Sequence, residues 1–191
     1  MSNDNIKYTT PVGTFLYPRL ITPDTKFNAD GVYSCKLAIP ADDAKELIGL
    51  IETEVKKQGK IKPIKKNNEM NWADPPHTTR DDGEVVFSTK QIAHVTLPDG
   101  KSFDPVVLLF DAHKERIDPT TVNPWTGTRG KLRVELIPYS IALTGVGVSL
   151  RLKAAQILEL VEGGASAESC GFGDEEEFSA TTEEQDDDLP F

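Results

Sequence analysis

The charge of this 191-residue chain is divided unevenly along its length, and this division limits which residues can enter a folded core. All 21 basic residues lie at or before Lys153, whereas ten of the 31 acids lie after Glu162. Residues 1–162 are therefore neutral, and the last 29 residues carry the whole net charge of −10. Segment by segment, the sequence indicates a neutral body followed by an anionic tail.

The tail, residues 163–191, is rich in glycine, serine and acids and has few side chains to bury. This composition predicts disorder, so the folded domain is expected over residues 1–162. Solubility alone does not require a leucine and an aromatic residue at the extreme end of a charged segment. We therefore predict a partner-binding tip, which the acids steer toward a basic pocket. The tip consists of Asp186, Asp187, Asp188, Leu189, Pro190 and Phe191.

The body shows the two-residue alternation that is typical of β-strands. Strands are expected over Val12–Ile21, Gly31–Ile39, Glu84–Thr96, Pro105–Asp111, Gly130–Tyr139 and Gly145–Val161. The last two alternate most cleanly, and Ser140–Thr144 can join them as a hairpin. Five or six strands, one helix and long loops predict a mainly-β fold, a small antiparallel barrel.

One helix is expected over Ala41–Gln58, where apolar residues recur at helical spacing and Gly59 provides a stop signal. The following segment, Lys60–Asp82, contains three prolines and little periodicity, so we interpret it as a long loop. This loop contains Trp72, an unusual place for a large aromatic residue. Six lysines lie between Lys56 and Lys66, most simply as a solvated helix end.

Motifs of catalysis and metal binding are missing from the sequence. There is no G-x-S-x-G, G-x-x-x-x-G-K, H-E-x-x-H or C-x-x-C motif, and the three histidines are scattered. We therefore expect no enzyme activity, no cofactor and no metal.

The longest apolar runs are too short to span a membrane, and Met1–Lys7 has no apolar segment of the kind found in secretory signals. Two cysteines cannot form a disulfide framework, which suggests a reducing cytoplasm.

The body does contain the two residue types that bind single-stranded nucleic acid without regard to sequence. Cations follow the phosphates, and aromatic rings stack on bases. The outward-facing cations predicted by alternation are Lys36, Lys90, Arg129, Lys131, Arg133, Arg151 and Lys153. The candidate stacking residues are Tyr33, Trp72, Phe87, Trp125 and Tyr139.

Each candidate also has a purely structural explanation. Tyr33 and Phe87 share strand faces with apolar residues, which favours core packing over stacking. Trp72 and Trp125 lie in polar, proline-containing loops, where they either stack on bases or fold back over the barrel. The outward cations are equally compatible with a solvated sheet face.

Several short segments stand out when they are taken in order: Val12–Thr14, Gly31–Tyr33 with Leu37–Pro40, Lys131–Val134 with Ile137–Tyr139, Val146–Leu152, Leu158–Leu160 and the acidic tail. In this order and spacing they resemble the single-stranded DNA-binding proteins of tailed bacteriophages. The final Asp186–Phe191 is also similar to the tip of bacterial single-stranded DNA-binding proteins. The resemblance covers about residues 12–40 and 84–191 and does not include Lys60–Asp82.

This resemblance implies an OB-fold, a five- to six-stranded antiparallel Greek-key barrel, in a noncatalytic protein. It implies sequence-independent coating of single-stranded DNA during phage replication, recombination and repair, in the cytoplasm of the infected bacterium. It also implies that the tail recruits replication proteins such as a polymerase or a helicase-primase, and competes with DNA for the groove. Of the matching positions, Tyr139, Lys131 and Arg133 are those that the family uses for DNA. Asp30 stands where relatives carry a basic residue.

Our prediction therefore places phosphates along Lys131, Arg133, Arg151 and Lys153, and bases on Trp125 and Tyr139, with a weaker contribution from Tyr33. Lys36, Lys90 and Arg129 complete the predicted DNA-binding set. The protein is expected to be a monomer or a weak homodimer. The main alternative is an acidic-tailed adaptor or DNA mimic that binds basic proteins and never DNA. A small β-barrel hydrolase is a further alternative, but no pair of nucleophile and base supports it.

Overall fold

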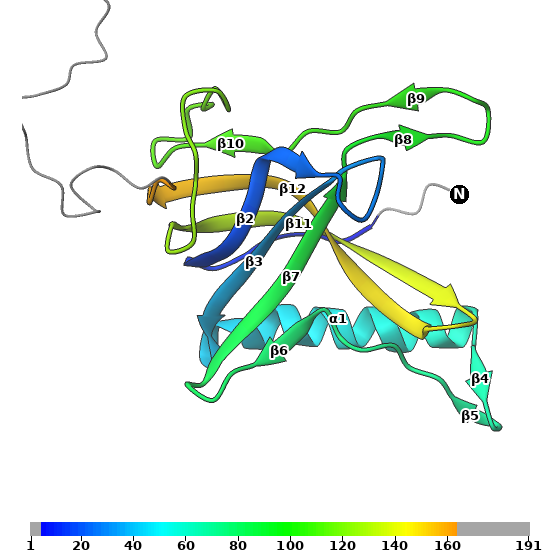
Figure 1. Ribbon diagram of the computed structural model, residues 1–191. Helices are drawn as coiled ribbons and strands as arrows, with labels where there is room; N and C mark the ends of the chain where they lie inside the picture. The colour runs from blue at the N-terminus through cyan, green and yellow to red at the C-terminus, as the bar shows by residue number, and fades with distance from the viewer. Residues whose placement is uncertain (1–4, 164–191) are drawn as a thin grey trace, which may run out of the picture.

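In the computed structural model of the chain, residues 5–163 are described. They form one helix and a set of strands, most of which belong to a single sheet (Figure 1). In chain order these are β1 (Lys7–Thr9), β2 (Gly13–Asp24), β3 (Val32–Pro40), α1 (Ala41–Ile61), β4 (Lys65–Lys66), β5 (Glu69–Met70), β6 (His77–Thr79), β7 (Glu84–Ile92), β8 (Val95–Thr96), β9 (Ser102–Phe103), β10 (Leu108–Phe110), β11 (Arg129–Ile141) and β12 (Gly145–Glu159).

Five strands close into a barrel, because β11 pairs with β2, β2 with β3, β3 with β7, β7 with β12, and β12 again with β11. The pairs are antiparallel except that β12 runs parallel to β7 and also to β10. The closure is uneven. β11 and β12 share thirteen residue pairs, whereas β2 and β11 share only two, Arg129 with Thr14 and Gly130 with Gly13. We call this short junction the seam.

Alternation along the strands places the apolar residues inside the barrel, as the sequence predicts. Leu132, Val134 and Leu136 of β11 are buried, while their neighbours Lys131 and Arg133 face outward. The largest fully buried side chains are Phe15, Phe87, Leu37, Ile39, Leu47, Ile51, Leu109, Leu132, Leu136, Leu150, Leu152 and Val134. Core packing is therefore the correct interpretation of Phe87. Cys35 is also buried, and burial raises the pKa of its thiol, so this cysteine is an unreactive core side chain.

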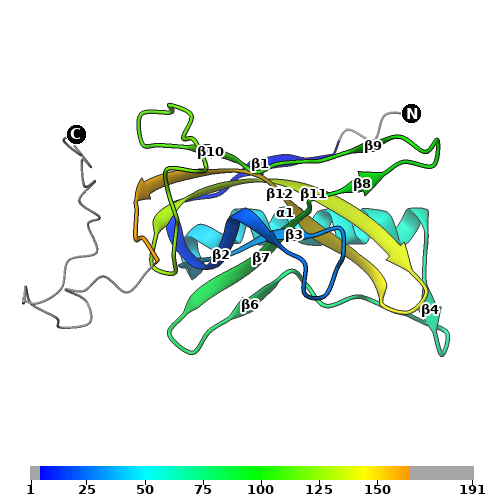
Figure 2. The same ribbon diagram turned by 45° about the horizontal axis from the view of Figure 1, so that its top comes forward.

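Helix α1 runs beneath the barrel and buries Ala44, Leu47 and Ile51 against it (Figures 1 and 2). The helix begins at the predicted residue, with Asp42 and Asp43 in its first turn, where carboxylates favour the helix dipole. The predicted end at Gly59 is wrong, because the helix continues to Ile61. A Cβ on Gly59 would lie 2.7 Å from the Trp72 ring, so the glycine lets the indole pack on the helix and does not end it.

Other predicted boundaries change because short strands have weak sequence signals. Lys60–Asp82 is not a continuous loop, since it contains the β4–β5 hairpin and β6, which pairs with β7. The expected strand Glu84–Thr96 divides into β7 and β8, and Pro105–Asp111 is reduced to β10. Apart from β7, each of these strands has only two or three residues, and each pairs with a strand that is either distant in the sequence or on the other side of a turn.

The seam provides a direct test of packing. A Cβ on Gly130 would overlap the carbonyl oxygen of Gln156 and lie 2.9 Å from Phe15 Cζ. Gly130→Ala is therefore expected to lower the free energy of unfolding by about 1–3 kcal/mol, as overpacking does. Gly49→Ala is the matched control, since Gly49 is exposed on α1 and a Cβ there would have no neighbouring atom within 4 Å. Alanine at this position should raise the free energy of unfolding by at most about 1 kcal/mol. Urea denaturation measures both, and equal effects of the two variants would contradict the prediction.

Candidate nucleic-acid interface

A row of polar and cationic side chains crosses the outer face of the barrel from strand to strand. Arg19 of β2 lies opposite Ser34 of β3, Ser34 lies opposite Lys90 of β7, and Lys90 lies opposite Arg151 of β12. Neighbouring strands are about 4.8 Å apart, so the row spans roughly 14 Å, with a cation on three of its four strands. We call it the cationic row.

Lys36 extends the cationic row sideways. It faces outward on β3 opposite Ser88, which places it diagonally across from Lys90. Arg151 is partly neutralised, because its guanidinium lies 3.5 Å from the Glu135 carboxylate. Among the described residues, no ion pair engages Lys36 or Lys90. These two ammonium groups, like the Arg19 guanidinium, are therefore available to meet a phosphate.

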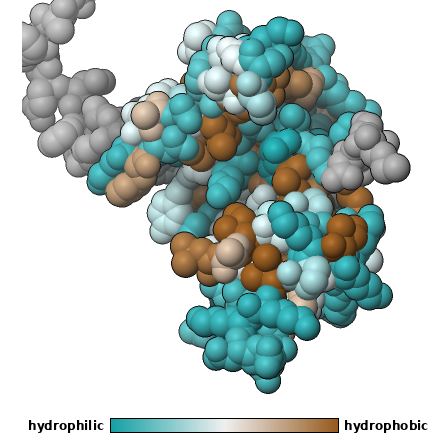
Figure 3. Space-filling view, turned by 90° about the vertical axis from the view of Figure 1, so that its right-hand side faces the viewer, coloured by the Kyte–Doolittle hydropathy of each residue, from teal (hydrophilic) through white to brown (hydrophobic). Residues whose placement is uncertain are grey.

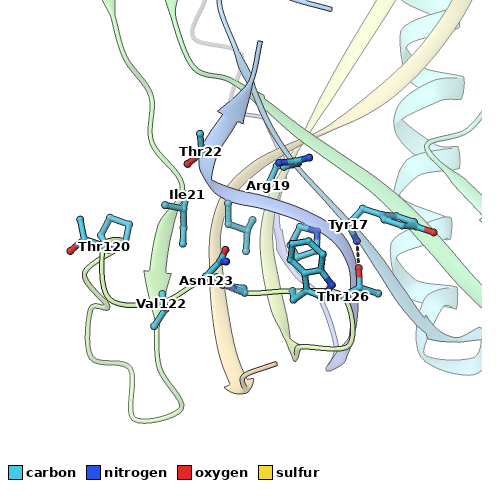
Figure 4. Close-up of a pocket in the computed structure, with 13 residues that line it drawn as sticks. Tyr17, Arg19, Ile21, Thr22, Thr120, Val122, Asn123 and Thr126 are labelled. Carbon is cyan, nitrogen blue, oxygen red and sulfur yellow. Dashed lines mark hydrogen bonds between the residues drawn. The ribbon is translucent and has the colours of Figure 1, made fainter. Parts of the chain in front are cut away.

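A pocket of about 430 Å³ adjoins the Arg19 end of the row, and we call it the Trp125 pocket. Residues 17–22 of β2 form one wall, and the loop of residues 119–126 forms the other (Figure 4). Trp125 and Tyr17 are 56% and 72% exposed there, so both rings are accessible to a ligand. Two exposed aromatic rings beside an arginine form a surface suited to stacked bases and their phosphates.

A bulge in β2 explains why Tyr17 is exposed. Between the pairs Leu16–Lys36 and Arg19–Ser34 the strand contains one residue more than its partner, and Tyr17 has a positive φ of 50°. A bulge turns a side chain away from the regular alternation, and a positive φ is uncommon for a tyrosine. The Tyr17 amide donates to Thr126 Oγ1 at 3.0 Å, which ties the bulge to the opposite loop (Figure 4).

The Trp125 loop is held on its other side by the end of the described chain. The Trp125 amide donates to the Val161 carbonyl at 2.7 Å, and Thr128 Oγ1 donates to the same oxygen at 3.0 Å. A Cβ on Gly163 would overlap the indole, so Trp125 packs directly on this glycine. Trp125 is therefore fixed in place beside the point where the predicted tail begins.

At the other end of the row, a second pocket of about 230 Å³ contains Tyr139 together with Ser88, Lys90 and Ser149. A Cβ on Gly147 would lie 2.6 Å from Tyr139 Oη and 2.9 Å from Ala73 Cβ. Gly147 therefore allows the tyrosine ring to lie across β12, with residue 73 next to it. The cationic row thus connects an aromatic pocket on each side.

The remaining predicted cations do not lie directly opposite any member of the row. Lys131 and Arg133 line a third pocket of about 330 Å³ with Lys114, and Arg133 donates to Thr9 Oγ1 at 2.9 Å. Arg129 pairs with the Glu159 carboxylate at 2.9 Å. Lys153 is the extra residue of a bulge in β12 between Leu152 and Ala154. Arg133 and Arg151 share the outer face, as predicted, but are diagonal and not directly opposite, because Arg151 lies opposite Glu135 and Arg133 opposite Ala154.

Tyr33 packs against the core from the inner face of β3, in agreement with the structural explanation of this residue. Sequence reasoning missed Tyr17, Arg19 and Ser34. The dipeptide Tyr17–Pro18 inside a strand pattern was the available signal, because proline inside a strand is found at bulges. The predicted tip residues Asp186–Phe191 lie outside the described residues.

Within residues 5–163, no group of three or more His, Cys, Asp or Glu side chains is arranged to hold a metal ion. Helix α1, the one helix of this part of the chain, is too polar to cross a membrane. His77 packs against the Phe87 ring, and burial lowers its pKa despite the opposing charge of Glu52, so it is an ordinary partly buried histidine.

No protein-family model matches the chain, and no curated protein matches it. Several solved structures match the chain. Bacteriophage T7 gp2.5, a single-stranded DNA-binding protein, superposes with a TM-score of 0.69 at 19% identity, over 93% of this chain and 100% of that one.

The single-stranded DNA-binding protein of bacteriophage Enc34, as a C-terminal truncation, has a TM-score of 0.58 at 13% identity, over 82% of this chain and 87% of that one. The same protein in complex with single-stranded DNA has a TM-score of 0.56 at 12% identity, over 82% and 88%. The chain therefore has the OB-fold of these phage proteins, which confirms the predicted fold.

Proposed function

We propose that the chain binds single-stranded DNA without regard to sequence, as a noncatalytic protein. One observation carries the proposal, the cationic row that connects the Trp125 pocket to the Tyr139 pocket on the outside of an OB barrel. Phosphates would lie along Arg19, Lys90 and Arg151, and bases would stack at the two ends. The fold shared with a phage protein solved in complex with single-stranded DNA supports the same ligand.

The proposed path differs in part from the one expected from the sequence. It retains Lys36, Lys90, Trp125, Tyr139 and Arg151 and adds Tyr17 and Arg19. Lys131 and Arg133, together with Lys114, form a separate basic patch around their own pocket. In this proposal the patch contacts the DNA strand beyond the two aromatic pockets. Arg129 and Lys153 contribute less to DNA binding than the patch and the cationic row do.

The biological role proposed is the coating and protection of single strands during phage DNA replication, recombination and repair, in the cytoplasm of the infected bacterium. The protein would act as a monomer or weak homodimer. Its acidic tail would compete with DNA for the groove and, once displaced, recruit replication proteins through Leu189, Pro190 and Phe191. The placement of Trp125 on Gly163 supports the competition, because the tail begins at the edge of the proposed path.

A titration of the full chain and of a variant that ends at Gly163 with oligo(dT), duplex DNA and oligo(U) tests this function. Tryptophan fluorescence should be quenched by oligo(dT), with an affinity that falls steeply as salt rises. The variant should bind oligo(dT) more tightly, because its competitor has been removed. Weaker binding by the variant would refute the competition. Absence of quenching in both proteins would refute DNA binding and favour an adaptor.

A further inference from the structure

One end of the molecule combines exposed apolar side chains with lysines that form no ion pair within residues 5–163, and the proposed DNA path does not use it. The last turn of α1, the β4–β5 hairpin and the β11–β12 turn meet there. Its apolar side chains are Ile61, Trp72, Ile141 and Leu143, which are 69%, 48%, 51% and 89% exposed. Its lysines are Lys60, Lys62, Lys65 and Lys66. We call these eight residues the lysine–apolar end.

Contacts between the three segments show that this end is a single surface. Ser140 Oγ donates to the Lys62 carbonyl at 2.8 Å and accepts from Gln58 Nε2 at 3.1 Å. The Val146 amide donates to the Asn71 carbonyl at 2.9 Å, and the Trp72 ring packs on Gly59. Figure 3 faces this end and shows hydrophobic side chains gathered above a hydrophilic protrusion at the bottom, where Figure 1 places β4 and β5.

The charge of this end is strongly positive. Across residues 60–72 there are four lysines and one acid, Glu69. None of the four lysines forms an ion pair with another side chain of residues 5–163. Nucleic acid would use these lysines and the exposed face of Trp72, but it would gain nothing from exposed Ile61, Ile141 and Leu143, which offer neither charge nor an aromatic face. A ligand that carries acids next to apolar side chains fits both features.

The chain itself contains such a ligand. Residues 186–191 place three aspartates directly before Leu189, Pro190 and Phe191. Aspartates would meet the lysines while the leucine and phenylalanine cover the exposed isoleucines and leucine. Exclusion of water from these side chains supplies the binding free energy, and the charge pairs supply orientation.

The positions of the two ends of the DNA path favour a neighbouring copy as the source of the tip. The described chain ends at Gly163 under Trp125, at one end of the path. Tyr139, at the other end, lies near Ala73, next to Trp72 of the lysine–apolar end. Figures 1 and 2 agree that the end of β12 and the β4–β5 hairpin lie at opposite ends of the molecule. Copies bound in one orientation along a strand would place the tail origin of one copy beside the lysine–apolar end of the next.

The length of the tail permits this contact. The 28 residues after Gly163 can span at most about 100 Å when fully extended. Helix α1, which runs most of the length of the molecule, has 21 residues and is therefore about 31 Å long. A tip released from the groove can thus reach an adjacent copy. Such a contact joins two different surfaces, and contacts of this kind produce an open array when the rotation between copies does not close into a ring.

We propose that residues 186–191 of one copy dock on the lysine–apolar end of the next copy along a single strand, which makes DNA binding cooperative. This inference rests on the proposed function, because the strand holds the copies in line. The groove and the docking surface alternate as sites for the tail, the first without DNA and the second with DNA bound.

The test compares full chains on two lengths of oligo(dT). A docking-surface variant carries Leu143→Ser, Lys65→Glu and Lys66→Glu. A tip variant carries Leu189→Ala and Phe191→Ala. On an oligo of about 12 nucleotides, within the range one OB-fold covers, the docking-surface variant should bind as the wild type does. On long poly(dT), each variant should lose at least about tenfold in cooperativity, because the linked second contact is gone.

A mixture of the two variants distinguishes docking of a neighbouring copy's tip from docking of the chain's own tip. The docking-surface variant has an intact tip and the tip variant has an intact docking surface, so a 1:1 mixture should recover part of the cooperativity. If the tip docks on its own copy, the mixture recovers none, and the proposal is wrong. A matched control, Leu97→Ser with Lys101→Glu on the β8–β9 hairpin, should leave cooperativity unchanged.

Other outcomes are equally informative. Equal losses of the docking-surface variant on short and long DNA would make this end part of the DNA path and overturn the proposal. Unchanged cooperativity in both variants would also overturn it. Leu143→Ser alone, at a side chain that is 89% exposed, provides a variant with little risk to folding, and its thermal unfolding should match the wild type. Absence of any oligo(dT) binding by the wild type would instead refute the proposed function.

Discussion

Replacement of both Lys36 and Lys90 by glutamate is expected to weaken oligo(dT) binding on the order of 100-fold at 0.1 M salt. Each phosphate contact on a single strand contributes about 0.7 to the slope of log affinity against log salt, or roughly 0.7 decades at 0.1 M. Loss of two contacts then accounts for about 25-fold, and repulsion by the new carboxylates accounts for the rest. The salt slope should fall by about 1.4.

The choice of these two lysines makes the result specific. Neither one forms an ion pair with another side chain of the described region, so the exchange removes no intramolecular partner. Arg151 is less suitable, because a carboxylate in its place would face Glu135. Lys60→Glu with Lys62→Glu changes the net charge by the same amount, outside the cationic row. An equal loss of affinity for a short oligo in this control would show that total charge, and not the row, governs binding.

Trp125→Ala should lower the affinity for oligo(dT) by about 5- to 150-fold, since one stacked base is worth roughly 1–3 kcal/mol. The salt slope should stay unchanged, because stacking releases no counterions. Trp125→Phe should retain most of the affinity. Trp72→Ala serves as the matched control on a short oligo, because the Trp72 ring packs against Gly59 of α1, outside the proposed path.

The same pair of tryptophans gives a spectroscopic readout. In the Trp72→Ala variant, oligo(dT) should still quench the fluorescence of Trp125. In the Trp125→Ala variant, the remaining fluorescence of Trp72 should be nearly insensitive to a short oligo. The reverse result would place the stacking site at Trp72 and contradict the proposed path.

Alternation alone predicted much of the fold correctly. It placed Leu132, Val134 and Leu136 inside and Lys131 and Arg133 outside, because the side of the sheet depends only on period 2. The start of α1 was also predicted correctly, from an apolar stripe and two acids in the first turn. The end of α1 was predicted wrongly, because a glycine in a sequence can mark either the end of a helix or a place where another side chain packs closely. At Gly59 that side chain is Trp72, thirteen residues further along the chain.

The cationic row required information that a single sequence does not contain. Lys90 and Arg151 are neighbours only because β12 runs parallel to β7, and Arg19 joins them only because a bulge shifts β2 against β3. Alternation assigns each residue to a face but not to a partner on another strand. The predicted set of cations was therefore correct in facing outward, while its grouping around Lys131 and Arg133 depended on a strand register that the bulge at Lys153 changes.

The seam of two residue pairs between β2 and β11 has a consequence for how a bound strand leaves. Segments of a protein open with different free energies, and short junctions such as the seam, or the two residue pairs between β7 and β12, are expected to open locally before the long β11–β12 pairing does. The Trp125 pocket spans the same junction, with β2 on one side and the loop that leads into β11 on the other. In the proposed complex, a base held between these walls would join β2 to the loop that leads into β11. Release of the strand would then be coupled to opening of the junction.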